Sequence, residues 1–322
     1  MDKNSLRIIY MGTPDFAVEA LRRLVEDGYN VVAVVTMPDK PVGRHQSRLQ
    51  PSPVKEYALS KGLPVLQPEK LKDPAFISQL ESCHADLQVV VAFRMLPEVV
   101  WNMPRLGTFN IHASLLPQYR GAAPINWTII NGERESGLTT FFLQHDIDTG
   151  DIIDQVRVPI GDDCTAGELH DTLMALSGDL AVKTADAIIN GTVTSTPQKD
   201  LCPDTPLHPA PKIFKDTCRL DLSRPLDEVY NFVRGLAPSP GAWATLRTGD
   251  TELTVKIYGA KKRPEAHNLP AGTIVCNGKK SLDVALQGGF LHITELQVAG
   301  KKRMDTASFL CGFKFCGNET LI

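Results

Sequence analysis

Residues 108–117 read Thr-Phe-Asn-Ile-His-Ala-Ser-Leu-Leu-Pro. Side chains alternate between the two faces of a strand, so Phe109 and Ile111 share one face while Asn110 and His112 share the other. A strand in the middle of an α/β sheet is normally apolar on both faces, so an amide and an imidazole there need partners. The Ser-Leu-Leu-Pro turn ends this strand, which places the polar pair at a carboxyl end, where open α/β sheets bind their ligands.

This polar pair has two interpretations. Taken in isolation, an Asn and a His at such positions are more often core residues whose hydrogen bonds are satisfied inside the fold, because active-site residues are few. The alternative is a chemical site built on one face of the strand. The rest of the sequence decides between the two interpretations.

Strands and helices alternate along residues 6–190. The expected strands are rich in β-branched and apolar residues, as in a parallel sheet that is covered on both faces. The alternation predicts an α/β fold with a doubly wound, Rossmann-like parallel sheet in an N-terminal domain of residues 1–190. The clearest strand signals lie at residues 6–11, 29–36, 86–93, 108–112, 137–143 and 152–159.

The first of these strands leads into the sequence Gly-Thr-Pro-Asp-Phe at residues 12–16. Thr13 is a natural N-cap for the helix that follows, with Pro14 at the first helical position. A strand, a glycine turn and a helix are typical of nucleotide-binding folds, but only one glycine of the Gly-x-Gly-x-x-Gly pattern is present. A dinucleotide-dependent dehydrogenase is therefore disfavoured.

A second, smaller domain follows a linker. Residues 191–208 are rich in Thr, Ser, Pro and Asp, which is typical of a linker. Beyond them, short alternating strands lie between glycine turns and predict a small β-barrel over residues 209–322. The expected barrel strands lie at residues 242–246, 253–258, 272–275, 281–286 and 290–296.

The net charge of −3 hides an asymmetry between the two parts of the chain. Residues 1–208 hold 18 Lys+Arg against 26 Asp+Glu, whereas residues 209–322 hold 16 against 11. A basic C-terminal domain suggests a polyanionic partner, although a solvated, lysine-rich surface would have the same composition. Its cations fall in or beside the expected turns, where they could contact a phosphate backbone. They are Lys261, Lys262, Arg263, Lys279, Lys280, Lys301, Lys302 and Arg303.

Residues 37–53 form a long connection with four prolines and the potential cations Lys40, Arg44, His45 and Arg48. A loop of this length is uncommon inside a compact domain unless it binds something. A mobile surface insertion is the alternative.

Several classes of protein are disfavoured by the composition. No apolar run reaches the roughly 18 residues that span a bilayer, and the first residues do not resemble a signal peptide, so we expect a cytoplasmic protein. The seven cysteines are scattered without a Cys-x-x-Cys pair, which predicts free thiols rather than a disulfide framework or a zinc site. The acidic run at residues 146–151 does not keep the spacing of a calcium loop.

Taken together, these motifs resemble the methionyl-tRNA formyltransferase family, and the resemblance runs nearly end to end. The Asn-x-His…Asp core is shared by the folate-dependent formyltransferases and the formyltetrahydrofolate hydrolases. The Pro-Asp-Lys-Pro loop and the basic barrel are what point to tRNA. The segments that carry the resemblance are residues 12–16, 38–41, 43–44, 51–55, 110–117, 119–125, 148–151 and 210–213.

The resemblance implies 10-formyltetrahydrofolate as the formyl-donor cosubstrate, tetrahydrofolate as its product and methionyl initiator tRNA as the acceptor. It implies neither a metal nor a membrane, and a monomer is the simplest expectation. The catalytic residues would be Asn110, His112 and Asp148. The amide and a protonated imidazole would donate hydrogen bonds to a tetrahedral oxyanion, and the carboxylate would help relay the proton from the attacking amine.

The family's binding regions also map onto this sequence. The barrel resembles an oligonucleotide-binding (OB) fold, so residues 209–322 would be an OB-like tRNA-binding domain. The folate contacts would be Val91, Ala92, Ser114, Leu115, Leu116 and Pro117. The tRNA contacts would be Lys40, Arg44, Arg48, Lys261, Lys262, Arg263, Lys301, Lys302 and Arg303.

The sequence departs from the family pattern in two places. Residues 89–97 are one residue shorter than usual, and Arg94 stands where the family has glycine. Residues 143–146 replace the usual Met-Asp-x-Gly turn.

Three other functions fit parts of the sequence. The same scaffold could serve a nucleotide-sugar amine formyltransferase or a hydrolase that passes formyl to water, but neither needs the cationic loop and the basic tail. A noncatalytic RNA-binding protein would have no use for the three catalytic candidates. The tRNA formyltransferase interpretation is the one that uses every motif.

Overall fold

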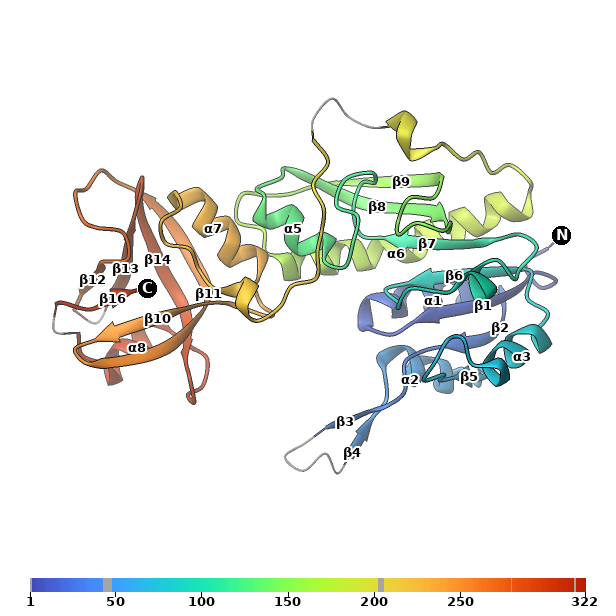
Figure 1. The fold of residues 1–322 in the computed structure, drawn as a ribbon, viewed down its shortest axis with the longest axis horizontal. Coiled ribbons are helices and arrows are strands. Elements are labelled where there is room, and N and C mark those ends of the chain that lie inside the picture. Colours follow the sequence, from blue (N-terminus) through green and yellow to red (C-terminus); the bar gives the residue numbers. More distant parts are fainter. Residues whose placement is uncertain (1, 43–47, 202–205, 279, 316) are drawn as a thin grey trace. The chain divides into compact units, whose positions relative to one another are not determined.

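A computed structural model describes residues 2–42, 48–201, 206–278, 280–315 and 317–322 of the chain (Figure 1). The chain divides into two compact units, neither of which is continuous in sequence. The first unit consists of Met1–Gly121, Ser136–Val158 and His170–Pro209, and the second of Ala122–Glu135, Pro159–Leu169 and Ala210–Ile322. Two short pieces of the predicted N-terminal domain, residues 122–135 and 159–169, are thus built into the second unit.

The first unit contains a seven-stranded sheet whose strands are β1 (Arg7–Gly12), β2 (Asn30–Val35), β5 (Val65–Leu66), β6 (Leu87–Val91), β7 (Thr108–His112), β8 (Glu135–Phe142) and β9 (Ile152–Pro159). Their order across the sheet is β5-β2-β1-β6-β7-β8-β9. The five strands from β5 to β7 are parallel to their neighbours, and β8 is antiparallel to β7. The predicted doubly wound α/β class is confirmed, with β8 as an antiparallel addition to the parallel core.

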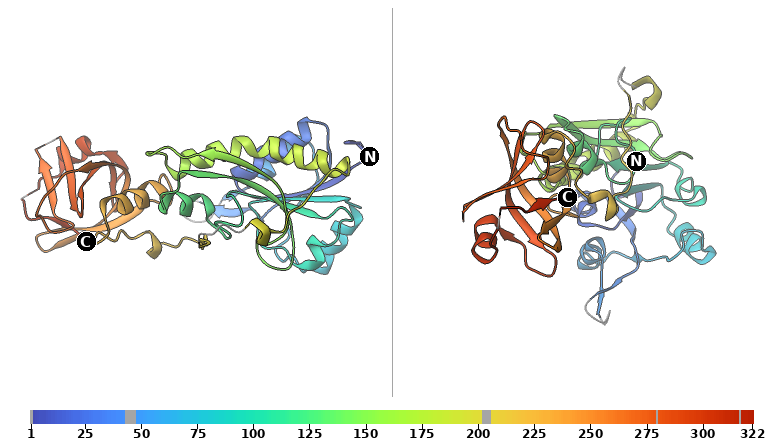
Figure 2. Two further views of the ribbon diagram at one scale, coloured as in Figure 1. Left: turned by 90° about the horizontal axis from the view of Figure 1, so that it is seen from above. Right: turned by 60° about the vertical axis from the view of Figure 1, so that its left-hand side comes forward.

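Helices cover both faces of this sheet (Figure 2). On one face lie α1 (Val18–Glu26) and α6 (Ala166–Ile189), which are joined by an ion pair between Arg23 and Asp179 at 3.0 Å. α2 (Pro53–Ser60) contacts α1. On the other face, α3 (Pro74–Ser82) and α4 (Glu98–Trp101) pack against the apolar side chains of β1, β2 and β6. Within the described part of the chain, no helix is both long and apolar enough to cross a membrane.

The start of α1 differs from the sequence prediction. A 3-10 turn, η1 (Asp15–Ala17), precedes the α-helix, and the helix begins only at Val18. The hydroxyl of Thr13 is buried and has no hydrogen-bond partner among the residues that the structure describes. The predicted Thr13 cap is therefore wrong, because the additional turn moves the start of the helix out of reach of this side chain.

The cationic connection at residues 37–53 contains a β-hairpin. β3 (Lys40–Val42) pairs antiparallel with β4 (Arg48–Gln50), and Lys40 lies opposite Gln50 on the exposed hairpin (Figure 1). Residues 43–47, which include Arg44 and His45, lie outside the described residues. Residues 40–42 and 48–50, which the prolines and charges of this connection predicted to be loop, are therefore short paired strands.

The second unit contains the antiparallel strands β10 (Ala242–Thr248), β11 (Thr251–Pro264), β12 (Ile274–Asn277), β13 (Ser281–Leu286), β14 (Gly289–Val298), β15 (Met304–Asp305) and β16 (Thr320–Leu321). Their order is β12-β13-β14-β11-β10-β16, and β15 pairs with β14. A bridge between Thr273 and Thr320 joins the first and last strands of this order, which curls the sheet into a barrel. The predicted β-barrel class is confirmed.

The helices of the second unit are α5 (Pro124–Ile130), α7 (Leu226–Gly235) and α8 (Thr306–Gly312). Val229 and Val233 of α7 are buried in the same apolar core as the barrel strands. Lys261, Lys262 and Arg263 lie at the end of the long strand β11, paired with β14, beside the connection that follows Pro264, so the strand extends further than predicted. Lys301, Lys302 and Arg303 do lie in the turn before β15.

We expect that Gly272→Ala opens the barrel. Gly272 has φ of 85°, its carbonyl accepts from Leu321 N, and an added Cβ would collide with the Leu321 carbonyl. The substitution should lower the free energy of unfolding by about 3 kcal/mol, because collision adds to the backbone strain of about 1–2 kcal/mol. Urea unfolding, together with amide exchange at Leu321, measures the loss.

The matched control is Gly249→Ala. Gly249 also has a positive φ, of 55°, but nothing lies within 4 Å of the added Cβ, so only the backbone strain should be measured. Equal losses for the two variants would show that closure between Gly272 and Leu321 is not what stabilises the barrel.

Candidate active site

The site begins with the polar face of β7, at the carboxyl end of the strand. Asn110 is half-buried and His112 is buried, so the sheet holds both side chains in place. The parallel neighbour β6 ends at Val91, which pairs with Ile111 of β7. The carboxyl ends of two parallel strands therefore lie side by side at His112, where open α/β sheets bind ligands.

The imidazole of His112 has a defined proton arrangement. Nε2 lies 2.9 Å from the carbonyl oxygen of Tyr119. Because a carbonyl can only accept, Nε2 must donate, and in the neutral ring Nδ1 is then left without a proton. Nδ1 faces Oδ2 of Asp148 at 3.9 Å, and both side chains are largely buried. His112 thus presents its titratable nitrogen to a carboxylate.

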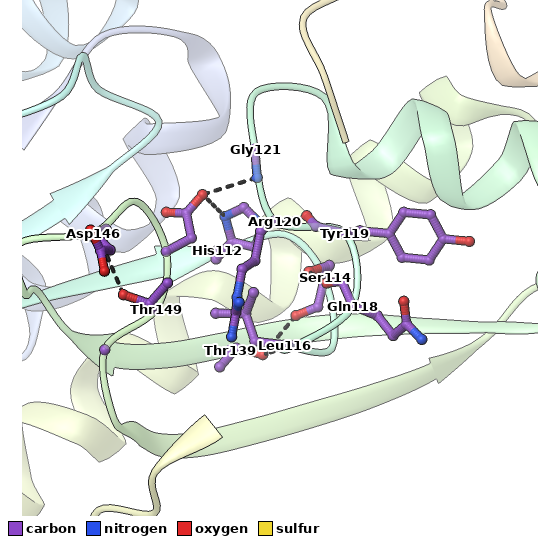
Figure 3. Close-up of polar contacts among 12 residues, drawn as sticks. His112, Ser114, Leu116, Gln118, Tyr119, Arg120, Gly121, Thr139, Asp146 and Thr149 are labelled. Carbon is purple, nitrogen blue, oxygen red and sulfur yellow. Dashed lines mark hydrogen bonds and ion pairs between the residues drawn. The ribbon is translucent and has the colours of Figure 1, made fainter. Parts of the chain in front are cut away.

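Asp148 lies on the connection between β8 and β9 and has a left-handed backbone, with φ of 53°. Its Oδ2 accepts a hydrogen bond from Gly121 N at 3.0 Å, and Gly121 lies beside His112 (Figure 3). The connection turns tightly, since a Cβ at Gly150 would collide with the carbonyl oxygen of Phe142. The structure thus places Asp148 next to His112, with Asn110 on the same face of β7.

The side chain of Asn110 has no hydrogen-bond partner among the described residues. A half-buried amide usually has its hydrogen bonds satisfied, so an unpaired one at the ligand edge of a sheet is available to a ligand oxygen. The plainer interpretation of this residue, as a satisfied core amide, does not fit. The described residues also contain no group of three or more His, Cys, Asp or Glu that could hold a metal ion.

The turn after β7 is held by hydrogen bonds from β8 and β9. Thr139 Oγ1 donates to the carbonyl of Ser114 at 2.7 Å and accepts from Leu116 N at 3.1 Å. Gln155 Nε2 donates to the Leu116 carbonyl and to Thr139 Oγ1, both at 2.9 Å. The side chains of Ser114, Leu116 and Pro117 are buried, whereas Leu115 is half-buried. Of the four predicted folate contacts in this turn, only Leu115 therefore presents appreciable surface.

Comparison with known proteins shows which family the chain belongs to. The formyl transferase family model matches residues 6–184, and the formyl transferase C-terminal domain model matches residues 212–314. The methionyl-tRNA formyltransferase of Parabacteroides distasonis is 61% identical over 323 residues and covers 100% of both chains. That of Bacteroides thetaiotaomicron is 61% identical over 315 residues and covers 98% of each. The chain belongs to the methionyl-tRNA formyltransferase family.

A solved structure shares the fold of this family member. The N-formyltransferase from Helicobacter canadensis, in complex with folinic acid and dTDP-3-aminofucose, has a TM-score of 0.62 and 20% sequence identity. The match covers 93% of this chain and 100% of that chain. At this level of identity the likeness concerns the fold alone.

Arg94, which departs from the family's glycine, has a structural role in this member. Its guanidinium donates to the carbonyl oxygens of Pro68 and Glu69, and burial lowers its pKa. It therefore ties the segment after β6 to the segment after β5. The predicted folate contacts Val91 and Ala92 immediately precede it, with Val91 buried and Ala92 exposed at a φ of 45°.

The structure divides the predicted barrel cations into two groups. Lys262 pairs with Asp227 at 2.6 Å, Arg263 pairs with Asp283 at 3.0 Å, and Arg303 pairs with Glu295. Lys261, Lys301 and Lys302 are exposed and have no carboxylate partner among the described residues. The three lysines of the second group are therefore free to bind an external anion.

Sequence analysis missed Gln198, which lies in η2 (Gln198–Leu201) within the predicted linker. Its side chain is 3% exposed and donates to the carbonyl oxygens of Asp148 and Gly150. No periodicity or motif marks this residue, because the surrounding composition is that of a solvated linker. A buried glutamine in such a segment can be identified only from its contacts in the structure.

We expect that Thr139→Val loosens the turn at residues 114–117. Valine keeps the shape but leaves the Ser114 carbonyl and the Leu116 amide without their partner, which should lower the free energy of unfolding by about 2–3 kcal/mol. Denaturant unfolding and faster exchange of the Leu116 amide measure the effect.

Thr140→Val is the control on the neighbouring residue of β8. Thr140 is equally buried, but its hydroxyl is bonded to Thr184 at 3.0 Å and not to the turn. It should cost about 1 kcal/mol and leave exchange at Leu116 unchanged. The same exchange rate in both variants would contradict the role given to Thr139.

Proposed function

We propose that this chain transfers the formyl group of 10-formyltetrahydrofolate to the α-amino group of methionyl initiator tRNA, which yields N-formylmethionyl-tRNA for translation initiation. Family membership at 61% identity over the whole chain supports the substrates. The observation that carries the chemistry is the unpaired Asn110 amide on the same strand face as His112, whose Nδ1 faces Asp148 at 3.9 Å. These three residues supply a donor, a titratable ring and a carboxylate.

The reaction needs stabilisation of an oxyanion and one proton transfer. The amine nitrogen attacks the formyl carbon, and the carbonyl oxygen becomes negative in the tetrahedral intermediate. Collapse of the intermediate breaks the bond between the formyl carbon and N10 of the folate, and the proton lost by the amine is delivered to the departing nitrogen. No covalent bond to the protein is needed.

Each candidate has a defined part in this scheme. The Asn110 amide donates to the oxyanion, which such a donor stabilises by about 3 kcal/mol. His112 acts through Nδ1, because Nε2 is bonded to Tyr119; when protonated, Nδ1 donates to the oxyanion, and when neutral it accepts a proton. Asp148 stabilises the protonated ring and assists proton transfer. We infer that one copy of the chain, acting in the cytoplasm, carries the complete site.

We infer that substrate binding is divided between two sequence domains, whose bounds differ from those of the compact units because residues 122–135 and 159–169 belong to the second unit. We place the catalytic domain at residues 1–190, the linker at 191–208 and the tRNA-binding domain at 209–322; the family models at 6–184 and 212–314 support this division. The folate would lie against Val91, Ala92 and the turn at residues 114–117. Lys40, Arg44 and Arg48 of the connection at residues 37–53, together with the unpaired barrel lysines, would contact phosphates of the tRNA.

The function is tested by formyl transfer from 10-formyltetrahydrofolate to methionyl initiator tRNA. Parallel reactions contain uncharged tRNA, a nucleotide-sugar amine or water alone. Formylation confined to methionyl-tRNA supports the proposal. Transfer to the sugar amine, or release of formate without an acceptor, would assign this fold to one of the other formyl-transfer reactions.

We expect that His112→Ala lowers kcat by about 100-fold or more, as loss of a general acid–base group does, while tRNA affinity stays within a factor of two. Single-turnover formylation and filter binding measure the two quantities. The control is His145→Ala, on the same connection as Asp148 but 73% exposed. Retained transfer in the His112 variant would remove this residue from the mechanism.

The unpaired barrel lysines should dominate the electrostatic part of tRNA binding. Each phosphate contact contributes about 0.7–0.9 to the slope of log affinity against log salt, so Lys302→Ala should lower that slope by about 1. The neighbouring control, Arg303→Ala, should change it less, because this guanidinium is already bonded to Glu295. Salt titrations of tRNA binding measure both; equal changes would contradict the division into paired and unpaired cations.

A further inference from the structure

The side chain of Gln198 is saturated with hydrogen bonds inside the first unit. Nε2 donates to the carbonyl oxygens of Asp148 and Gly150, both at 2.8 Å. Oε1 accepts from Arg120 Nε at 2.9 Å and from Nη2 at 2.6 Å. Because carbonyls only accept and a guanidinium only donates, the orientation of this amide is unambiguous. A buried glutamine with four such bonds holds its neighbours in fixed positions.

What Gln198 holds is the connection that carries Asp148. The left-handed backbone of Asp148, at φ of 53°, is unfavourable for a residue with a side chain and persists only where its surroundings impose it. The buried Gln198 amide bonds the carbonyl oxygens of Asp148 and Gly150, which lie on either side of Thr149. These two bonds supply the constraint. The position of the carboxylate against His112 therefore depends on a side chain from outside the connection.

Arg120 and Gly121 complete a closed set of contacts around Asp148. Gly121 N bonds the carboxylate of Asp148, and Arg120 bonds the Gln198 amide that bonds the Asp148 backbone. Arg120 has no carboxylate within ion-pair distance in the part of the chain that the structure describes. Its guanidinium is thus used to orient an amide oxygen rather than to neutralise an acid.

We propose that Gln198 and Arg120 are positioning residues, which hold the Asp148 carboxylate against the Nδ1 of His112. This inference rests on the proposed function for its kinetic consequence but not for its structural one. Without the amide, the connection relaxes from its left-handed conformation and the carboxylate leaves the imidazole. Proton transfer then slows, whereas both substrates still bind, because the buried Gln198 side chain is not available to either of them.

The test compares Gln198→Met with Lys199→Ala. Methionine keeps the length and apolar volume of glutamine but can form none of the four hydrogen bonds, and Lys199 is an exposed neighbour in the same short helix. We expect kcat for formyl transfer to fall about tenfold or more in Gln198→Met, with KM for the folate and the tRNA within a factor of two. Lys199→Ala should match the original protein. An unchanged kcat in Gln198→Met would overturn the proposal.

A double-mutant cycle with Asp148→Asn separates positioning from general damage. If Gln198 acts through the Asp148 carboxylate, Gln198→Met should cause little further loss of kcat in the Asp148→Asn protein. The same fold-loss in both backgrounds would show that Gln198 acts elsewhere. Arg120→Lys, which keeps the charge but not the paired donors to Oε1, should give an intermediate loss.

Amide hydrogen exchange tests the structural part even if the chain formylates a different acceptor. The Gly121 amide donates to the Asp148 carboxylate at 3.0 Å. Withdrawal of the carboxylate frees this amide, so Gly121 should exchange faster in Gln198→Met than in Lys199→Ala. Equal exchange of the Gly121 amide in the two variants would overturn the proposed positioning.

Discussion

The hydrogen bond between His112 Nε2 and the Tyr119 carbonyl is the contact on which the site depends, because it determines which ring nitrogen can change its proton. That carbonyl is positioned by a segment far along the chain. Tyr119 has a left-handed backbone at φ of 59°, its amide donates to the His208 carbonyl at 2.8 Å, and its ring stacks on His208 at 5.9 Å. The proton arrangement of His112 therefore depends on Tyr119 and, through Tyr119, on His208.

The segment after α6 acts as part of the site's support rather than as a spacer. It reaches the connection of Asp148 through Gln198, and it reaches the turn after β7 through His208. The first contact supports Asp148, and the second supports Tyr119, whose carbonyl bonds His112. The strand β7 is rigid because its backbone is bonded on both sides, whereas the two turns are not, so the additional contacts are needed where the sheet gives no support.

Much of the fold follows from the sequence, but the site follows only in part. The period of two in residues 108–112 is enough to place Asn110 and His112 on one face, since strand geometry is local. Asp148 is identified by its match to a family pattern, because no local rule places a turn residue against a strand. Gln198 could not be predicted, since its role arises from contacts over 48–78 residues of sequence. The extension of β11 through Lys261–Arg263 also escaped prediction, because cross-strand pairing with β14 outweighs the weak strand preference of charged residues.

The antiparallel direction of β8 explains why Asp148 needs so much support. Had β8 been parallel to β7, the residues after it would emerge at the same edge as His112. Instead β8 ends with Phe142 opposite Phe109, whereas His112 lies opposite Thr139. The connection must turn back on itself to bring a carboxylate to the imidazole, and this requires the close approach at Gly150 and the left-handed residue at Asp148. A conformation of this kind is not maintained by its own backbone, so the hydrogen bonds from Gly121 and Gln198 are the structural consequence of the strand direction.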